Sequence, residues 1–198
     1  MRDKRFSSGS INFQSEEVKF KLDENGKPIE TYIKEQKEAN HLVEEFMLLA
    51  NETVAKHTRN KKLAGIYRVH PEPDPENLEE LRDFVAIFGI SCGELTSRKE
   101  VNKLLRNINK HPIAQVLKIK FLRSLKQACY RSTPDGHYGL AKRDYLHFTS
   151  PIRRYSDLVV HRIIEQWLKK EQKIPKFSDS LESLAKHISV TERNSVDA

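Results

Sequence analysis

The sequence predicts a mixed α/β (α+β) fold, in which an N-terminal β-hairpin and short strands are followed mostly by helices. Two short apolar runs flank the Asn25-Gly26 pair, a strong local signal for a tight hairpin turn. Downstream, apolar residues recur every three or four positions over several segments, as amphipathic helices require. With 198 residues and 37% hydrophobic content, the chain is long enough to bury one substantial core, in one or two domains.

Short strands are predicted in the first half of the chain. Residues 18–22 face residues 29–33 across the Asn25-Gly26 turn, so these runs form the hairpin. Residues 11–13 also have the character of a short strand. The run IleTyrArgValHis at residues 66–70 is typical of a buried strand, and closely spaced prolines end it.

Helical periodicity covers most of the remaining sequence. One helix ends at Gly89, which suits the left-handed position just after a helix. The last helix, capped by Ser178, is still in phase where the sequence stops at Ala198. The predicted helices cover residues 36–56, 76–88, 97–109, 112–130, 151–170 and 178 onward.

The same spacing predicts which helix faces are buried. In the first helix, the pattern leaves Glu44 and Glu45 less buried than their apolar neighbours. The faces expected inside are Ala39, Leu42, Val43, Phe46, Leu49, Ala50 and Val54 in residues 36–56; Val116, Ile119, Leu122 and Leu125 in residues 112–130; Ile152, Tyr155, Val159, Ile163 and Trp167 in residues 151–170; and Leu181, Leu184, Ala185 and Ile188 in the last helix.

One helix start carries an unusual charge pattern. Ser150 is a preferred N-cap residue and Pro151 suits the first helical position, so Arg153 and Arg154 are expected in the first turn. The helix dipole normally favours Asp or Glu at that end. Free backbone N–H groups and two guanidinium groups instead form a site suited to a phosphate. The alternative is that Arg153 pairs with Asp157 one turn later while Arg154 faces solvent.

Composition favours a polyanionic partner. The chain has 35 Lys and Arg against 28 Asp and Glu, which gives a net charge of +7 and a pI near 9.3. Its two cysteines, Cys92 and Cys129, lack metal-type spacing and favour a reduced intracellular setting. No apolar run reaches the roughly 18 residues that a membrane-spanning helix needs. We therefore expect a soluble, cytoplasmic protein with no membrane partner.

Several common catalytic motifs are absent from the sequence. There is no HExxH, GxxxxGK[ST] or CxxC pattern, which argues against zincin, P-loop and thioredoxin-like sites. Metal-assisted phosphodiester chemistry needs several carboxylates close together, and the aspartates here are scattered. We expect His137, His147 and His161 to be hydrogen-bonded structural residues rather than catalytic bases.

The longest informative motif, GHYGLAxxxYxHFTSPIRRYxDLxxHR, runs over residues 136–162. It closely resembles the C-terminal part of the catalytic (RNB) domain of the ribonuclease II / ribonuclease R family, nearest to the bacterial ribonuclease R branch. Three further blocks resemble the same domain in the same order: INFxSEEVKF at 11–20, EANHLVEEFMLLAN at 38–51 and YRVHPEPDP at 67–75.

The resemblance implies a processive 3′-to-5′ exoribonuclease that hydrolyses single-stranded RNA to nucleoside 5′-monophosphates. It also implies Mg²⁺, with no other small-molecule cofactor, held by aspartates in an N-terminal motif of the catalytic domain. This sequence does not contain that motif. Residues 1–198 would then be the C-terminal part of one RNB catalytic domain, without the aspartate motif and the flanking OB-fold domains, and inactive alone.

The resemblance also assigns roles to individual residues. Arg153 matches an arginine that holds the phosphate near the scissile bond, a catalytic role whose loss typically costs on the order of 10²-fold in rate. Phe13 matches an aromatic residue that stacks on a terminal base, although a buried strand residue is the alternative. Glu44 matches an acid near ribose hydroxyls, and Glu192 a glutamate that touches the nucleotide. Arg154 and Tyr155 support the site through phosphate contact or packing.

Two other functions fit the residues. A non-catalytic module that binds single-stranded RNA would use the same basic surface without hydrolysis. A helical protein-interaction domain would have no nucleic-acid role, and its binding would lack the steep salt dependence that phosphate contacts impose.

Overall fold

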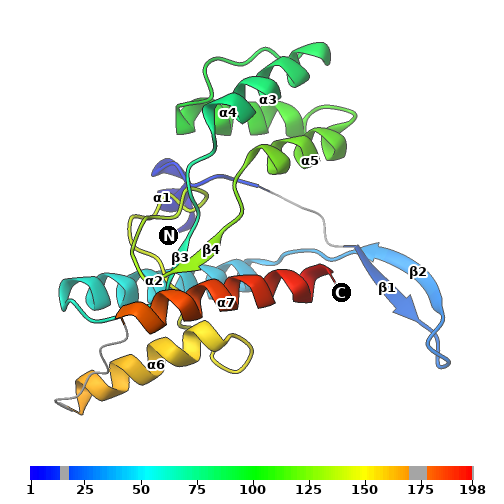
Figure 1. The fold of residues 1–198 in the computed structure, drawn as a ribbon. Helices are drawn as coiled ribbons and strands as arrows, with labels where there is room; N and C mark the ends of the chain where they lie inside the picture. The colour runs from blue at the N-terminus through cyan, green and yellow to red at the C-terminus, as the bar shows by residue number, and fades with distance from the viewer. Residues whose placement is uncertain (14–17, 170–177, 198) are drawn as a thin grey trace.

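The computed structural model describes residues 1–13, 18–169 and 178–197, and it confirms the mixed α+β fold (Figure 1). The hairpin comes first and helices dominate the rest. In chain order the elements are α1 (Arg2–Ser7), β1 (Val18–Leu22), β2 (Pro28–Ile33), α2 (Glu38–Asn60), β3 (Tyr67–Val69), α3 (Pro75–Ile87), α4 (Arg98–Asn109), α5 (Ala114–Ser124), β4 (Cys129–Arg131), α6 (Tyr155–Leu168) and α7 (Ser178–Asp197).

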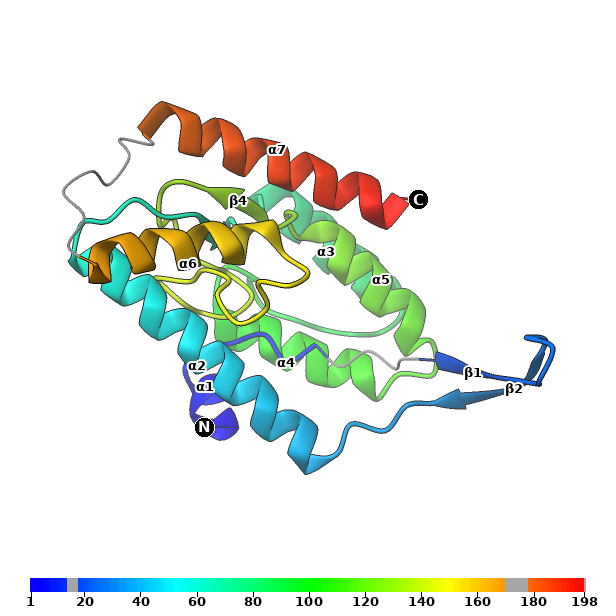
Figure 2. The ribbon, with the colours of Figure 1, turned by 90° about the horizontal axis from the view of Figure 1, so that it is seen from below.

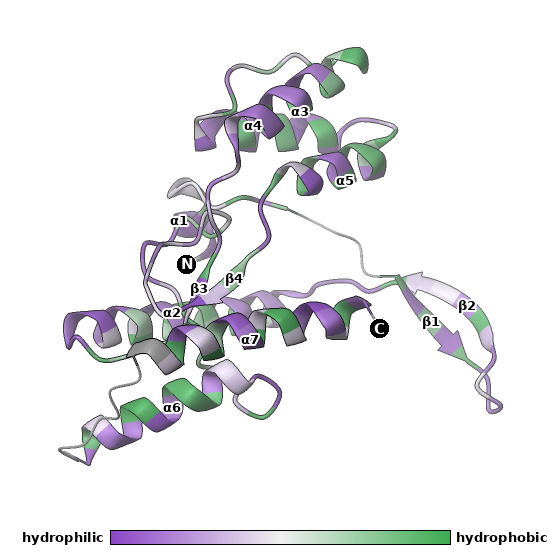
Figure 3. Cartoon of the chain, viewed as in Figure 1, coloured by the Kyte–Doolittle hydropathy of each residue, from purple (hydrophilic) through white to green (hydrophobic). Residues whose placement is uncertain are grey.

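The elements form a body, a lobe and a projecting hairpin (Figures 1 and 2). Helices α2, α6 and α7 surround the short β3–β4 pair and make the body. Helices α3, α4 and α5 make the lobe, which the chain enters after β3 and leaves before β4. The β1–β2 hairpin extends away from the body, and Figure 3 shows hydrophobic residues along it.

Body and lobe have separate hydrophobic cores. The lobe core is a contiguous cluster in which α3, α4 and α5 meet. The body core joins β4, α6 and α7, and a second buried cluster of the body joins α2, β3 and α6. Buried members of the lobe core include Leu78, Leu81, Val85, Val101, Leu104, Leu105, Ile108, Leu117 and Phe121. Buried members of the body core are Ile66, Tyr130, Val159, Ile163, Leu181, Ala185 and Ile188.

The predicted hairpin is confirmed. Val18 pairs with Ile33 in an antiparallel register, and the turn closes where the Asp23 N–H donates to the Lys27 carbonyl at 2.9 Å. Gly26 has a φ of 79°, the left-handed conformation that Gly adopts readily.

The predicted buried strand at residues 66–70 is also confirmed, as β3. Its partner β4 was not predicted, because residues 112–130 were assigned to one helix. The helix is shorter, since α5 ends at Ser124 and the chain then returns to pair Tyr130 with Arg68. Leu125 follows the helix in an extended conformation, with a ψ of 152°.

The strand predicted at residues 11–13 is wrong. Ile11 donates its N–H to the Gly139 carbonyl at 2.8 Å, but residues 11–13 form no β-ladder. This short apolar segment packs against the lobe core through Ile11 and Phe13 rather than joining a sheet.

The buried face predicted for the first helix is wrong as well. Leu42, Val43, Phe46 and Leu49 of α2 are each about half exposed, whereas Glu45 is only 7% exposed. Arg5 of α1 explains this, because its guanidinium lies 2.6 Å from the Glu45 carboxylate. Apolar spacing does not report a partner that lies so far away in the sequence. The buried residues of α2 are Glu45, Asn51, Ala55 and Thr58.

Helix α5 buries a different apolar stripe from the predicted one. Leu117 and Phe121 face the lobe core, while Val116, Ile119 and Leu122 are about half exposed. Two apolar stripes share this helix, and the period of 3.6 residues fits both. Only Leu125 of the predicted set packs against the lobe core.

The remaining helix predictions fare better. Helix α3 is followed by Gly89 with a φ of 74°, and Ser97 caps α4 by accepting the Lys99 N–H. The predicted inner face of α7 lies in the body core, although the Ser178 side chain is outside the described residues. Among the helices of the described residues, none combines the length and the apolar character needed to span a membrane.

Candidate nucleic-acid interface

The predicted site residues fall into two clefts. The α6–α7 cleft, of about 680 Å³, is lined by Arg153, Arg154, Tyr155 and Glu192. The α1–α2 cleft, of about 720 Å³, lies beside α1 and the start of α2 and is lined by Phe13 and Glu44. In each cleft, the fold thus brings together predicted site residues from distant parts of the sequence. The other residues lining the α6–α7 cleft include Tyr130, His147, Ser156, His187, Ile188 and Thr191.

Arg153 and Arg154 lie in a tight turn that precedes α6. The Ser150 carbonyl accepts the N–H groups of Arg153 and Arg154 at 3.3 and 3.1 Å, and the helix begins only at Tyr155. The prediction that Ser150 and Pro151 open the helix is therefore wrong. Ile152 of the predicted apolar stripe is fully exposed, whereas Val159 and Ile163 are buried.

Arg154, and not Arg153, is the residue that pairs with Asp157. Its Nε and one terminal nitrogen each lie 2.9 Å from a different oxygen of the carboxylate. The Asp157 side chain is completely buried and also accepts the Ser150 N–H at 2.9 Å. The alternative drawn from spacing, which paired Arg153 with Asp157 and left Arg154 in solvent, assigned the two arginines the wrong way round.

In this turn, the Arg153 guanidinium is the positive charge that Asp157 does not neutralise. Burial raises the pKa of Asp157, but hydrogen bonds from Arg154 and the Ser150 N–H outweigh burial and hold this pKa below its usual value. Asp157 therefore stays ionised and neutralises Arg154. Arg153 is exposed, and among the described residues its guanidinium has no ion pair or hydrogen bond. It is free to meet an anion that enters the cleft.

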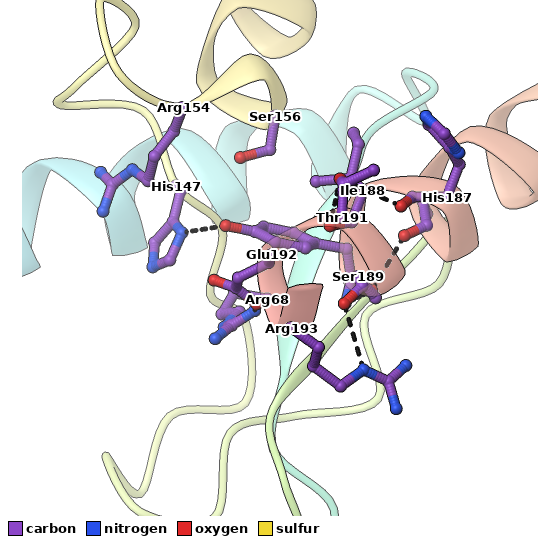
Figure 4. A network of polar contacts seen from close by, with 12 residues as sticks. Arg68, His147, Arg154, Ser156, His187, Ile188, Ser189, Thr191, Glu192 and Arg193 are labelled. Atoms are coloured by element: carbon purple, nitrogen blue, oxygen red, sulfur yellow. Dashed lines mark hydrogen bonds and ion pairs between the residues drawn. The ribbon is translucent and has the colours of Figure 1, made fainter. Parts of the chain in front are cut away.

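The floor of the α6–α7 cleft is a polar network that joins three elements (Figure 4). The Tyr130 hydroxyl lies 2.9 Å from His147 Nδ1, and the Arg68 guanidinium lies 4.6 Å from the Tyr130 ring centroid. Arg68 also donates to the Glu192 carboxylate at 2.6 Å. One Glu192 oxygen is thus already bound by Arg68, a contact that the sequence did not reveal.

His147 is neutral at physiological pH. Burial, followed by the charges of Arg154 and Arg68, lowers the pKa of this imidazole from 6.5 to about 3. His137 has a pKa lowered to about 3 as well, through burial and the neighbouring His70. The third predicted histidine, His161, lies with its Nε2 2.8 Å from the Phe148 carbonyl. All three are hydrogen-bonded, as expected of structural histidines.

A row of tyrosine and histidine rings extends from the floor of the α6–α7 cleft into the body of the protein. Consecutive members meet edge to face at centroid separations between 5.2 and 5.8 Å. Such contacts favour one fixed arrangement of the loop that carries the motif. The row consists of Tyr138, His70, His137, Tyr145, His147 and Tyr130.

In the α1–α2 cleft, Phe13 packs on the lobe core and also borders the cleft. Its ring lies parallel to that of Phe121, with centroids 6.4 Å apart and planes inclined by 14°, and it packs against the lobe core. The same side chain is only half-buried and lines the cleft. Glu44 is exposed, and its carboxylate lies 3.2 Å from Arg5. Arg2, Arg5, Lys34 and Lys118 give this cleft a cationic lining.

The described residues do not fit the Mg²⁺ site that the family resemblance implies. They contain no group of three or more His, Cys, Asp or Glu side chains that could hold a metal ion. Two buried aspartates are already paired, Asp157 with Arg154 and Asp144 with Arg59 at 2.9 Å. Among the described residues, these two aspartates are therefore held in ion pairs and not in a metal site.

Comparison with known proteins agrees with the motif. The family model described as the RNB domain matches residues 1–170. The chain belongs to the RNB domain family. Ribonuclease R of Thermotoga maritima is 40% identical over 201 residues, an alignment that covers 98% of this chain and 28% of the relative. This RNB-domain chain therefore spans little more than a quarter of the length of that curated relative.

Solved structures give the same result. RNase R of Mycoplasma genitalium, in complex with ribose-methylated single-stranded RNA, superposes with a TM-score of 0.83 at 30% identity, covering 96% of this chain and 30% of that one. Yeast Ssd1, described as a pseudonuclease, has a TM-score of 0.61 at 26% identity, covering 77% of this chain and 19% of that one. The RNB-type fold thus occurs in a protein named as a nuclease and in one named as a pseudonuclease.

Proposed function

We propose that this RNB-domain chain grips single-stranded RNA in a processive 3′-to-5′ exoribonuclease that releases nucleoside 5′-monophosphates. The observation that carries this proposal is the exposed Arg153 guanidinium at the cleft, which has no partner among the described residues, in a turn whose other arginine is neutralised by Asp157. Family membership and the RNA-bound relative support RNA as the polyanion.

In this proposal the RNA backbone enters the α6–α7 cleft. Arg153 donates to phosphate oxygens next to the bond that is cut and offsets the negative charge that builds there. Glu192 and Tyr155 lie beside the same nucleotide, and Arg154 stiffens the turn. Mg²⁺, held by residues other than the described ones, would supply the metal chemistry that cleaves the bond.

The α1–α2 cleft has a different task in the proposal. Phe13 stacks on a base, a contact worth roughly 1–3 kcal/mol that tolerates any base. Glu44 accepts a hydrogen bond from a ribose 2′-hydroxyl, which favours RNA over DNA. Arg2, Lys34 and Lys118 attract the backbone to this cleft.

Arg153→Ala tests the main role. In the polypeptide as its gene encodes it, turnover of a single-stranded oligoribonucleotide should fall on the order of 10²-fold or more. Affinity for the same RNA should fall only about fivefold at 0.1 M salt, because one phosphate contact contributes a slope of about 0.7 in log K against log salt. The control is Arg162→Ala, an exposed arginine on α6 that lines neither cleft. Near-normal turnover with Arg153→Ala would rule out the catalytic role.

A non-catalytic RNA-binding protein is the second candidate. The pseudonuclease Ssd1, which shares this fold, favours it. A nuclease assay with Mg²⁺ beside a gel shift with the same single-stranded RNA separates the two. A shifted band without cleavage by the gene-encoded polypeptide supports the binding protein.

A further inference from the structure

Asp157 holds the turn before α6 at both of its ends. At one end it accepts the Ser150 N–H at 2.9 Å, and at the other it accepts two hydrogen bonds from Arg154, each also 2.9 Å long. A further hydrogen bond of 3.1 Å comes from Ser156 Oγ. Arg153 is the residue between these anchors, and its backbone N–H is tied to the Ser150 carbonyl.

The two anchors restrict the position of Arg153 without using its side chain. A completely buried carboxylate with four hydrogen bonds has little freedom to move, so the backbone that it holds is fixed as well. The bidentate contact also occupies the Arg154 fork, which leaves Arg153 as the cation that faces the cleft. A charge held in place before the anion arrives loses less entropy on binding than a mobile one.

We infer that Asp157 is a positioning residue, which fixes the turn of residues 150–154 so that Arg153 meets an RNA phosphate in the α6–α7 cleft. This inference rests on the proposed function, because it requires Arg153 to contact RNA. It adds a residue to which neither the motif nor the comparisons assign a role. Asp157 itself touches no RNA, since it is sealed beneath the turn.

A double-mutant cycle in the polypeptide as its gene encodes it, with EDTA present to prevent metal-dependent cleavage of the RNA, tests the inference. The affinity for a fluorescein-labelled oligouridine is measured by anisotropy over a range of salt concentrations, for the wild type, Arg153→Ala, Asp157→Asn and the double variant. In the wild-type background, Arg153→Ala should weaken binding about fivefold at 0.1 M salt and lower the salt slope by about 0.7. In the Asp157→Asn background, the same change should weaken binding less than twofold, because the guanidinium is no longer held towards the cleft.

A matched control separates positioning from general loss of structure. Asp144 is another buried acid, 2% exposed and paired with Arg59. In an Asp144→Asn background, Arg153→Ala should keep its full effect of about fivefold. Arg154→Lys provides a milder variant for the case in which Asp157→Asn fails to fold. It keeps the positive charge but loses the two-point contact, so it should also shrink the effect of Arg153→Ala.

The outcomes distinguish the two proposals. If Arg153→Ala weakens RNA binding in the wild type but equally in the Asp157→Asn and Arg154→Lys backgrounds, the positioning role is wrong and the proposed function stands. If Arg153→Ala has no effect on affinity or salt slope in the wild type, the inference falls, and the turnover of Arg153→Ala decides the proposed function separately. An effect that shrinks in these two backgrounds and persists with Asp144→Asn supports the inference.

Discussion

The Glu192 carboxylate accepts a 2.6 Å hydrogen bond from the Arg68 guanidinium and thereby ties the C-terminal half of α7 to strand β3. Arg68 also lies over the Tyr130 ring, so one cation joins β3, β4 and α7 at the floor of the cleft. The Arg68 and Glu192 side chains are 16% and 36% exposed, which limits what the pair contributes.

We predict that Glu192→Ala and Arg68→Ala each lower the free energy of unfolding by about 1 kcal/mol. The double variant should lose little more than Arg68→Ala alone, because both changes remove the ion pair and only Arg68→Ala also removes the contact with the Tyr130 ring. Urea unfolding followed by circular dichroism measures all three values. Strictly additive losses would show that the two residues stabilise the protein independently.

Phe13 should contribute to stability and to RNA affinity through different parts of its side chain. Phe13→Leu keeps an apolar contact with the lobe core but removes the flat ring, so RNA binding should weaken by about 1–3 kcal/mol with a smaller loss of stability. Phe13→Ala should lose about 2 kcal/mol of stability as well, roughly half the cost of emptying a fully buried site. Thermal unfolding and RNA anisotropy on both variants separate the effects. Unchanged RNA affinity in Phe13→Leu would assign Phe13 to packing alone.

Local signals in the sequence predicted the elements whose structure depends on near neighbours. Asn25-Gly26 fixed the hairpin turn, and Gly89 marked the end of α3, because a left-handed backbone position is a local requirement. The buried face of α7 was also predicted, since one apolar stripe dominates this helix.

Long-range partners explain the predictions that are wrong. Burial of Glu45 needs Arg5, forty residues earlier, and β4 needs β3 across the whole lobe. At the candidate site, spacing showed that an arginine could reach Asp157 but did not decide which one. The bidentate geometry and the Ser150 N–H decide it for Arg154. Arg68 was missed for the same reason, because its contact with Glu192 spans 124 residues.

Acid should destabilise the protein through its buried histidines. Between pH 6.5 and about 3, the unfolded chain protonates His137 and His147 while the folded chain does not, because their folded pKa values are about 3. The unfolded state then binds more protons, so the free energy of unfolding falls as the pH falls through this window. Each histidine contributes a slope of about 1.4 kcal/mol per pH unit.

His147→Gln should remove one of these two contributions. The slope of unfolding free energy against pH, measured by urea denaturation between pH 6.5 and 4, should flatten by about 1.4 kcal/mol per unit. Tyr130→Phe is the control, since it removes the hydrogen-bond partner of His147 but leaves the imidazole in place. An unchanged slope in His147→Gln would show that His147 takes up no proton on unfolding.

Chelation of divalent metal should leave RNA binding by this chain intact. The cationic side chains of the two clefts supply the attraction to phosphate, and the described residues offer no group of carboxylates, histidines and cysteines that could hold an ion. We predict equal affinity for a single-stranded oligoribonucleotide in EDTA and in EDTA-free buffer of matched ionic strength, measured by anisotropy. Added Mg²⁺ should weaken binding slightly, because it competes with Arg and Lys for the phosphates. A tenfold loss of affinity in EDTA, restored by Mg²⁺, would instead place a metal site on the RNA-binding surface of this chain.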